Sequence, residues 1–150
     1  MDILNDIESR MTEQDKPNQE LVLVRGASGS GKSTFVGKEY PNHVHLETDM
    51  YWYDDKGDYN FDPTKLKTAH EWCQRETLNA LKDGKNVVVS NTFIKKWEIE
   101  PYINMAKELG IPYKIYRMTA QYDNVHGVPL KVVKRMRDTI EPIDGETIVK

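Results

Sequence analysis

The sequence predicts an α/β fold in which helices cover both faces of a mostly parallel sheet. Two observations support this prediction: short apolar runs recur along the chain, and segments with helical periodicity separate them. The run LVLV at residues 21–24 is apolar at every position, which is typical of a strand buried on both faces. Because right-handed crossovers join such strands, the expected architecture is a three-layer α/β/α sandwich.

Four runs are interpreted as strands of this sheet. Residues 21–24, 86–89 and 113–118 are rich in valine and other apolar or aromatic residues, which favour strands. Residues 43–47 form a weaker run, because two histidines and a glutamate interrupt the apolar positions. A segment of helical character follows each run, so strand and helix alternate through most of the chain.

The intervening segments have the spacing of amphipathic helices, with apolar residues three or four positions apart. They lie at residues 2–12, 32–40, 63–83, 97–109 and from Pro129 onward, and a polar extension to residue 19 follows the first of them. Gly110 is a natural residue to end the helix at 97–109, and Pro129 suits the first turn of the last helix. Trp97 and Tyr102 are expected to anchor the helix at 97–109 on the core.

The length of the chain indicates a single domain that spans residues 1–150. A chain of this length buries roughly 68–70% of its unfolded surface, and one cysteine, Cys73, cannot form an internal disulfide. No apolar run approaches the roughly 20 residues that span a bilayer, and the acidic start is unlike a secretion signal. We therefore expect a cytoplasmic protein, monomeric or weakly dimeric, without a membrane partner. The net charge of −3 argues against a broad nucleic-acid-coating surface.

A glycine-rich motif carries the first functional prediction. Residues 26–33 read GASGSGKS and match G-x-x-x-x-G-K-[ST], with a predicted strand before them and a predicted helix after them. In such a loop successive N–H groups point at a phosphate, the lysine reaches the β- and γ-phosphates, and the hydroxyl of Ser33 ligates Mg²⁺. The predicted nucleotide-binding residues are Gly26, Ser28, Gly29, Ser30, Gly31, Lys32, Ser33 and Thr34. The bland alternative is a Gly/Ser-rich turn; the flanking elements favour a P-loop NTPase-type fold that binds ATP and Mg²⁺.

The residues after the strand at 86–89 bear on the reaction. Motor and switch NTPases place an aspartate after an apolar strand to hold the metal, but here Ser90, Asn91 and Thr92 follow. A small phosphotransferase needs only bound ATP·Mg²⁺, an aligned hydroxyl and a base. Asn91 and Thr92 are interpreted either as residues that orient an acceptor or a metal-bound water, or as a cap for the next helix.

Asp49 is the candidate base. It follows the strand at 43–47, at the carboxyl edge of the sheet where α/β proteins bind ligands. A carboxylate there can accept the proton of a hydroxyl that attacks the γ-phosphoryl group. The alternative is that Asp49 caps a helix or lies in a solvated loop.

Several segments together resemble the small P-loop kinases related to phage polynucleotide kinase, including the kinase-like domain of some larger eukaryotic proteins. The matching segments are GASGSGKST at 26–34, TDMYW at 48–52, FDPTKLKTAHEWC at 61–73, VVVSNT at 87–92, WEIEPYINMAKELG at 97–110 and NVHGVPLKVVKRM at 124–136. The resemblance implies transfer of the ATP γ-phosphate to a hydroxyl, with the 5′-OH of a polynucleotide or oligonucleotide as the leading acceptor. It also implies that Asp49 is the general base.

The chain departs from that family at two arginine positions. Met50-Tyr51-Trp52 stands where the family has an acceptor-binding arginine, and Asp123-Asn124 stands where it has a lid arginine. Five basic residues are candidates to substitute: Arg117, Lys131, Lys134, Arg135 and Arg137. We select Arg117 and Arg135 as catalytic, together with Lys32 and Asp49. Arg135 shares a helix face with Lys131, so both side chains could point at one anion. The alternative is a merely solvated basic face.

The segment from residue 47 to residue 62 is acidic and aromatic. This segment contains six carboxylates and one lysine. It also contains five aromatic residues: Tyr51, Trp52, Tyr53, Tyr59 and Phe61. These rings either stack on a base or sugar or pack beneath the loop. Because the charge repels a long polyanion, a chain terminus or a small hydroxyl compound is the easier acceptor. Alternative functions are therefore a nucleoside or small-molecule kinase, a kinase of a hydroxyl-bearing modified base in DNA, and a catalytically degenerate ATP-binding module.

Overall fold

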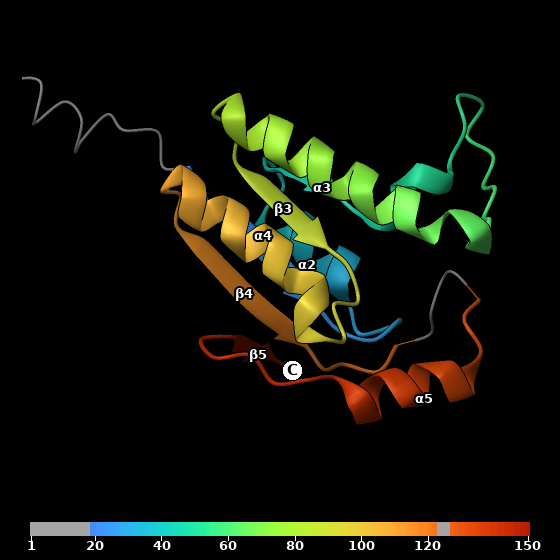
Figure 1. Cartoon of the computed structure of the whole chain (residues 1–150). Coiled ribbons are helices and arrows are strands. Elements are labelled where there is room, and N and C mark those ends of the chain that lie inside the picture. The colour runs from blue at the N-terminus through green and yellow to red at the C-terminus, as the bar shows by residue number, and fades with distance from the viewer. Residues whose placement is uncertain (1–18, 123–126) are drawn as a thin grey trace, which may run out of the picture.

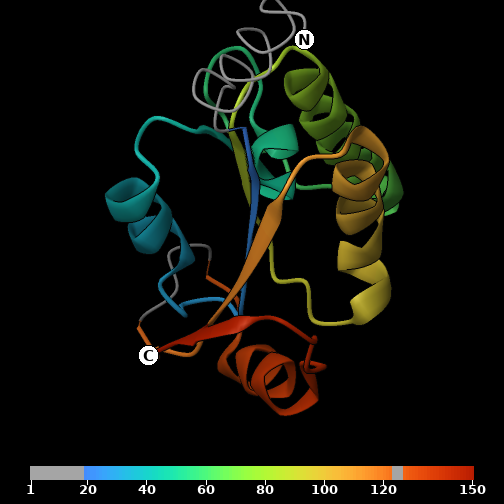
Figure 2. The ribbon, with the colours of Figure 1, turned by 90° about the vertical axis from the view of Figure 1, so that its left-hand side faces the viewer.

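The computed structural model describes residues 19–122 and 127–150. They form a five-stranded sheet in the order β2-β3-β1-β4-β5, in which every neighbouring pair is parallel. Helix α2 covers one face of the sheet and helices α3 and α4 cover the other (Figures 1 and 2). The predicted three-layer α/β/α architecture is confirmed. The helix predicted at 2–12 lies outside the described residues.

The strands have the bounds β1 (Leu21–Arg25), β2 (Val44–Leu46), β3 (Val87–Ser90), β4 (Tyr113–Met118) and β5 (Thr147–Val149). The first four agree with the four predicted runs. The fifth strand was not predicted, because it has three residues, two of them exposed, and so lacks the signature of a buried strand. Its pairing with β4, from Tyr116 opposite Thr147 to Met118 opposite Val149, is what makes it a strand.

The helices have the bounds α2 (Lys32–Glu39), α3 (Leu66–Lys82), α4 (Lys96–Leu109) and α5 (Leu130–Thr139), with short 3₁₀ helices η1 (Thr48–Trp52) and η2 (Pro63–Lys65) before α3. Gly110 ends α4 with a left-handed φ of 68°, as predicted. The last helix begins one residue later than predicted, at Leu130, and Pro129 is its N-cap residue. Among the described residues no helix is long and apolar enough to cross a membrane.

Strand β1 lies at the centre of the sheet and explains why residues 21–24 are all apolar. Alternate side chains point to opposite faces, so Leu21 and Leu23 pack in the layer of α3 and α4, whereas Val22 and Val24 pack with Val36 of α2. All four strand residues are fully buried, and each burial contributes roughly 1.5–3 kcal/mol.

One anchor predicted for α4 is confirmed and the other is wrong. Tyr102 is 2% exposed and packs its ring edge against Phe93, with ring centroids 5.4 Å apart. Trp97 is 69% exposed. Spacing along a helix identifies a buried face better than residue size does, because Trp97 lies outside the stripe formed by Ile99, Tyr102 and Ala106.

Parallel strands bring their carboxyl ends to one edge of the sheet. The loop after β1, helix η1 after β2 and residues 91–92 after β3 all begin there. In Figure 1 the hairpin at residues 53–59 lies at the upper right of the molecule and helix α5 at the lower right. This edge is where α/β proteins bind ligands, and it carries the candidate site.

Candidate active site

The loop at residues 26–31 is shaped by glycines that no other residue replaces without strain. Gly26 has a φ of 152° and Gly31 a φ of 91°. A Cβ atom on Gly26 would lie 2.7 Å from the carbonyl oxygen of Met118, closer than real contacts allow. The Gly26 N–H donates to the carbonyl of Thr92 at 3.1 Å, so the end of β3 holds the start of the loop. The loop then enters α2 at Lys32, where the first helical N–H groups lack intrahelical partners.

Lys32 folds back over this loop. Its Nζ donates to the carbonyl oxygens of Gly26 at 2.9 Å and Ala27 at 3.0 Å. Burial lowers the pKa of Lys32 to about 8, against the opposing charges of Glu47 and Asp49. The ammonium therefore lies in a site that is short of negative charge, which a phosphate group would supply.

Glu47 is a site residue that the sequence analysis missed. Its Oε1 accepts hydrogen bonds from Ser33 Oγ at 3.2 Å and from Ser90 Oγ at 2.8 Å, and His45 Nε2 lies 3.2 Å away. Burial opposes ionisation of this carboxyl, but the bonds from His45, Ser90 and Ser33 outweigh it, and the pKa of Glu47 lies below its usual value. The available signal was register: β2 pairs with β3, so residue 47 lies beside residue 90.

The oxygen atoms near Ser33 fit a nucleotide-borne magnesium ion. Mg²⁺ usually keeps several waters and takes one or two protein oxygens together with phosphate oxygens. Ser33 Oγ and Glu47 Oε1 are such oxygens, and they lie within hydrogen-bond distance of each other. In the described part of the chain no group of three or more His, Cys, Asp and Glu residues is arranged to hold a metal ion.

Asp49 lies in η1, between the loop and the hairpin. The Thr48 N–H donates to Asn91 Oδ1 at 2.8 Å, so Asn91 holds the start of η1 rather than capping the next helix. Asp49 is close enough to Lys32 for its charge to oppose the lowering of the lysine pKa. On the other side, burial raises the pKa of Tyr59 and the charge of Asp49 raises it further. The carboxylate thus has electrostatic contact with both regions.

The hairpin is organised by Asp54. Tyr53 and Tyr59 form an antiparallel bridge, and Asp54 accepts hydrogen bonds from the N–H groups of Lys56 and Asp58 and from Asn60 Nδ2. Asp62 accepts from Thr64 and starts η2. Two of the six carboxylates of this segment therefore have local structural roles.

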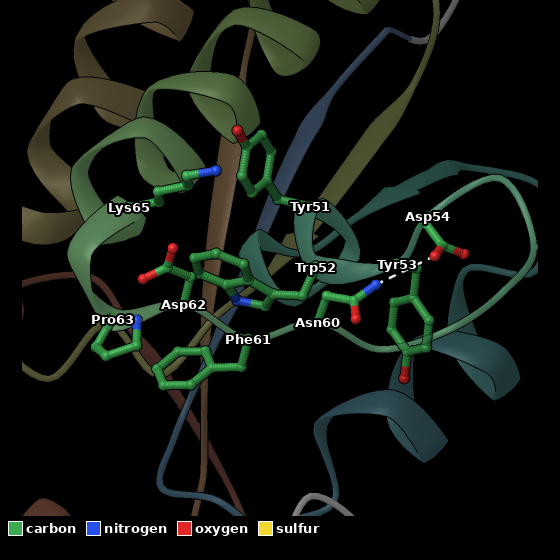
Figure 3. A pocket seen from close by; sticks show the side chains of 9 residues that line it. All are labelled: Tyr51, Trp52, Tyr53, Asp54, Asn60, Phe61, Asp62, Pro63 and Lys65. Carbon is green, nitrogen blue, oxygen red and sulfur yellow. Dashed lines mark hydrogen bonds between the residues drawn. The ribbon is translucent and has the colours of Figure 1, made fainter.

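A cavity of about 520 Å³ lies between this hairpin and η2 (Figure 3). Trp52 forms its floor and is 4% exposed, with the ring of Phe61 against it at 5.1 Å. Its lining residues are Tyr51, Trp52, Tyr53, Asp54, Asn60, Phe61, Asp62, Pro63 and Lys65. The packing of aromatic residues beneath the loop is confirmed for Trp52. Tyr53, Tyr59 and Phe61 are 49%, 44% and 52% exposed, and their stacking on a base or sugar stays a prediction.

The basic candidates lie on two elements, β4 and α5. Arg117 Nη1 pairs with Glu146 Oε2 at 3.2 Å, so it would lose this ion pair on turning to a phosphate. Arg135 is exposed on α5. A second cavity, of about 880 Å³, lies between residues 121–122 and α5, and its basic lining residues are Lys134 and Arg137. Asp123 and Asn124, the positions of the missing lid arginine, lie outside the described residues.

Comparison with known proteins assigns the family. Residues 21–126 match the family described as an AAA domain, and this match includes the loop, Glu47, Asp49 and the strand ends around them. The chain belongs to the AAA domain family. As an AAA domain with a phosphate-binding loop, it has a P-loop kinase-like fold that binds ATP.

The chain is also similar to individual proteins. The chain is 33% identical to human NEDD4-binding protein 2 over 129 residues, which are 77% of this chain and 7% of that protein. It is 39% identical over 97 residues, 62% of this chain, to 19% of an Acanthamoeba polyphaga mimivirus protein that carries the name of a bifunctional polynucleotide phosphatase/kinase. A gluconokinase from Sinorhizobium meliloti has the same fold, with a TM-score of 0.57 at 15% identity over 89% of this chain and 82% of that one. The AAA domain thus spans only a small part of these two sequence relatives.

Proposed function

We propose that the protein is an ATP- and Mg²⁺-dependent kinase that transfers the γ-phosphoryl group to a hydroxyl. The observation that carries the proposal is the position of Asp49. Asp49 shares helix η1 with Tyr51 and Trp52, which line the aromatic cavity, and its charge acts on Lys32 of the phosphate loop. We therefore expect a hydroxyl at this cavity and a γ-phosphate on the loop to lie near one carboxylate.

The proposed mechanism gives each group one role. The N–H groups at the start of α2 and the Lys32 ammonium bind the triphosphate, and Ser33 contributes an oxygen to the metal. Bound Mg²⁺ supplies positive charge that offsets the charge on the phosphate oxygens. Asp49 accepts the proton of the acceptor hydroxyl as its oxygen bonds to the γ-phosphorus, and the bond from that phosphorus to the β–γ bridging oxygen breaks. The products are ADP, the phosphate monoester and a proton.

The leading acceptor is the 5′-OH end of a polynucleotide or oligonucleotide. The mimivirus relative bears the name of a polynucleotide kinase, and the exposed rings of Tyr53, Tyr59 and Phe61 suit a terminal base, since stacking contributes about 1–3 kcal/mol per base. A terminal nucleoside enters such a cavity while the rest of the strand stays in solvent.

A nucleoside or other small hydroxyl compound is the second candidate. The cavity is lined by Asp54 and Asp62 and has one basic residue among its lining residues, Lys65. This balance does not favour the phosphates of an extended strand. Incubation with labelled ATP and a matched panel of 5′-hydroxyl oligonucleotides and nucleosides, read by mass change, distinguishes the two candidates.

The variant Asp49→Asn tests the role of the base. We expect phosphoryl transfer to fall by about 10²–10⁴-fold while ATP affinity stays within a few fold of wild type, because the amide keeps the shape but accepts no proton. Asp55→Asn, at an exposed position of the same hairpin, is the matched control and should transfer at the wild-type rate. A loss of less than about tenfold in Asp49→Asn is too small for a general base and would refute the assignment.

A further inference from the structure

Strand β3 ends without a carboxylate, although P-loop NTPases hold the nucleotide's magnesium ion with the loop Ser/Thr and an aspartate at a strand end. Here the last residue of β3 is Ser90, which is 2% exposed. The phosphate loop provides one member of this pair, the hydroxyl of Ser33. The other member, a carboxylate at the end of β3, is missing.

The neighbouring strand supplies the missing group. Leu46 of β2 pairs with Val89 of β3, and the next residues in register are Glu47 and Ser90. Adjacent strands are about 4.8 Å apart, so a carboxylate at the end of β2 can reach the metal position that a carboxylate at the end of β3 would reach. The Glu47 carboxylate does reach it, since its Oε1 lies 3.2 Å from Ser33 Oγ.

Two further contacts fix the direction of this carboxylate. Ser90 Oγ donates to Glu47 Oε1 at 2.8 Å, and His45 Nε2 lies 2.8 Å from Ser90 Oγ and 3.2 Å from Glu47 Oε1. The side chain is 19% exposed, so it is partly buried and keeps some access to solvent. Held in this way, the carboxylate lies beside Ser33 of the phosphate loop.

We propose that Glu47 of β2 is the carboxylate of the Mg²⁺ site, with Ser90 of β3 as its positioning residue, so that the two strand ends have exchanged roles. The inference rests on the proposed ATP binding and extends it to the residue that recognises the metal. It separates two neighbouring carboxylates: Glu47 acts on metal binding, whereas Asp49 acts on the acceptor's proton.

Metal-dependent nucleotide binding tests this assignment without measuring transfer. The probe is the β,γ-imido analogue of ATP, whose Kd is measured by calorimetry with excess MgCl₂ and with EDTA. For the wild type we expect Mg²⁺ to tighten binding. Glu47→Gln should weaken binding in Mg²⁺ by about 10–100-fold and leave binding in EDTA unchanged or slightly tighter. Glu39→Gln removes one exposed negative charge from α2 and is the matched control, expected to behave as wild type.

A carboxylate exchange keeps the test decisive if the single variant folds poorly. Glu47→Ser combined with Ser90→Asp returns the carboxylate to β3 and should recover most of the Mg²⁺ effect that Glu47→Ser alone loses. The inference is overturned if Glu47→Gln keeps a Mg²⁺ effect within threefold of the Glu39→Gln control, or if the folded exchange variant binds no better in Mg²⁺ than Glu47→Ser. A wild type that binds Mg²⁺ and nucleotide but phosphorylates no acceptor would refute the kinase and leave this assignment standing.

Discussion

Two cations lie at the two ends of the phosphate loop, one fully buried and one partly buried, and they differ in what neutralises them. Arg25 ends β1 and is fully buried; its guanidinium pairs with Glu146 Oε1 at 2.8 Å and donates to backbone carbonyls. Lys32 starts α2 and donates to two carbonyls of the loop itself, those of Gly26 and Ala27. A structural cation carries its own anion, whereas a cation of a binding site has its charge balanced by the ligand.

The Arg25 contacts join distant parts of the chain. They reach the carbonyl of Phe93, which follows β3 with a left-handed φ of 45°, and the carbonyl of Glu141 after α5. Glu146 also accepts from Arg117 and from the Ile143 N–H. Arg25 therefore holds the segment that leads into β5, and its effect is on stability rather than on the chemistry.

The largest effect is expected at Lys32. Lys32→Ala should lower phosphoryl transfer by about 10³-fold or more, since a charge that clamps the transferring group has an effect of this size. The thermal midpoint of unfolding should not fall, because the variant loses an ammonium group whose burial disfavours the folded state. Steady-state transfer and thermal unfolding measure the two quantities, and wild-type-like turnover would contradict the comparison.

Arg25→Met should do the opposite. We expect the free energy of unfolding to fall by about 3–5 kcal/mol, because the carbonyl of Phe93 and one oxygen of Glu146 lose their buried donor. In the fraction that remains folded, nucleotide affinity should stay within a few fold of wild type. Denaturant unfolding gives the first quantity and calorimetry the second; unchanged stability would mean that the buried pair is structurally dispensable.

The pH dependence of stability offers a smaller and more specific test. Folding lowers the pKa of Lys32 from 10.5 to about 8. Between these values the unfolded chain binds the proton and the folded chain does not, so stability attributable to Lys32 rises as pH increases from 8 to 10.5. We expect wild type to gain about 1–2 kcal/mol over Lys32→Met across this range, allowing for screening by solvent. A constant difference would show that Lys32 is not desolvated.

The smallest effect is expected for an exposed pair. Lys134 and Asp138 on α5 lie 2.9 Å apart, with side chains 79% and 58% exposed. Because solvent screens both charges, Lys134→Ala should leave the thermal midpoint within experimental error. A clear fall would show that distance to a partner, rather than burial, determines what a cation contributes to stability in this protein.

The features predicted correctly are those encoded in consecutive residues. The run at residues 21–24, the glycine pattern at 26–33 and the end of α4 at Gly110 depend on local conformation and on burial of one segment. The features that were missed depend on partners far along the chain. Arg25 was not singled out from the sequence, and it bonds to a residue 121 positions away.

The candidate site divides in the same way. Local pattern pointed to Lys32, Ser33 and Asp49 as binding and catalytic residues, and their roles stay predictions until the variants are made. Glu47 had no motif of its own, because its partners Ser33 and Ser90 come from two other elements.

The order of residues alone was enough for four strands, the helices α2 to α5, the layers and the phosphate loop, since hydrogen bonding, backbone freedom and apolar spacing act over a few neighbours. Side-by-side pairing of strands decided which carboxylate faces Ser33, which arginine is buried and whether residues 147–149 extend the sheet. Those outcomes arise from charges and hydrogen bonds between segments that meet only after the chain has folded.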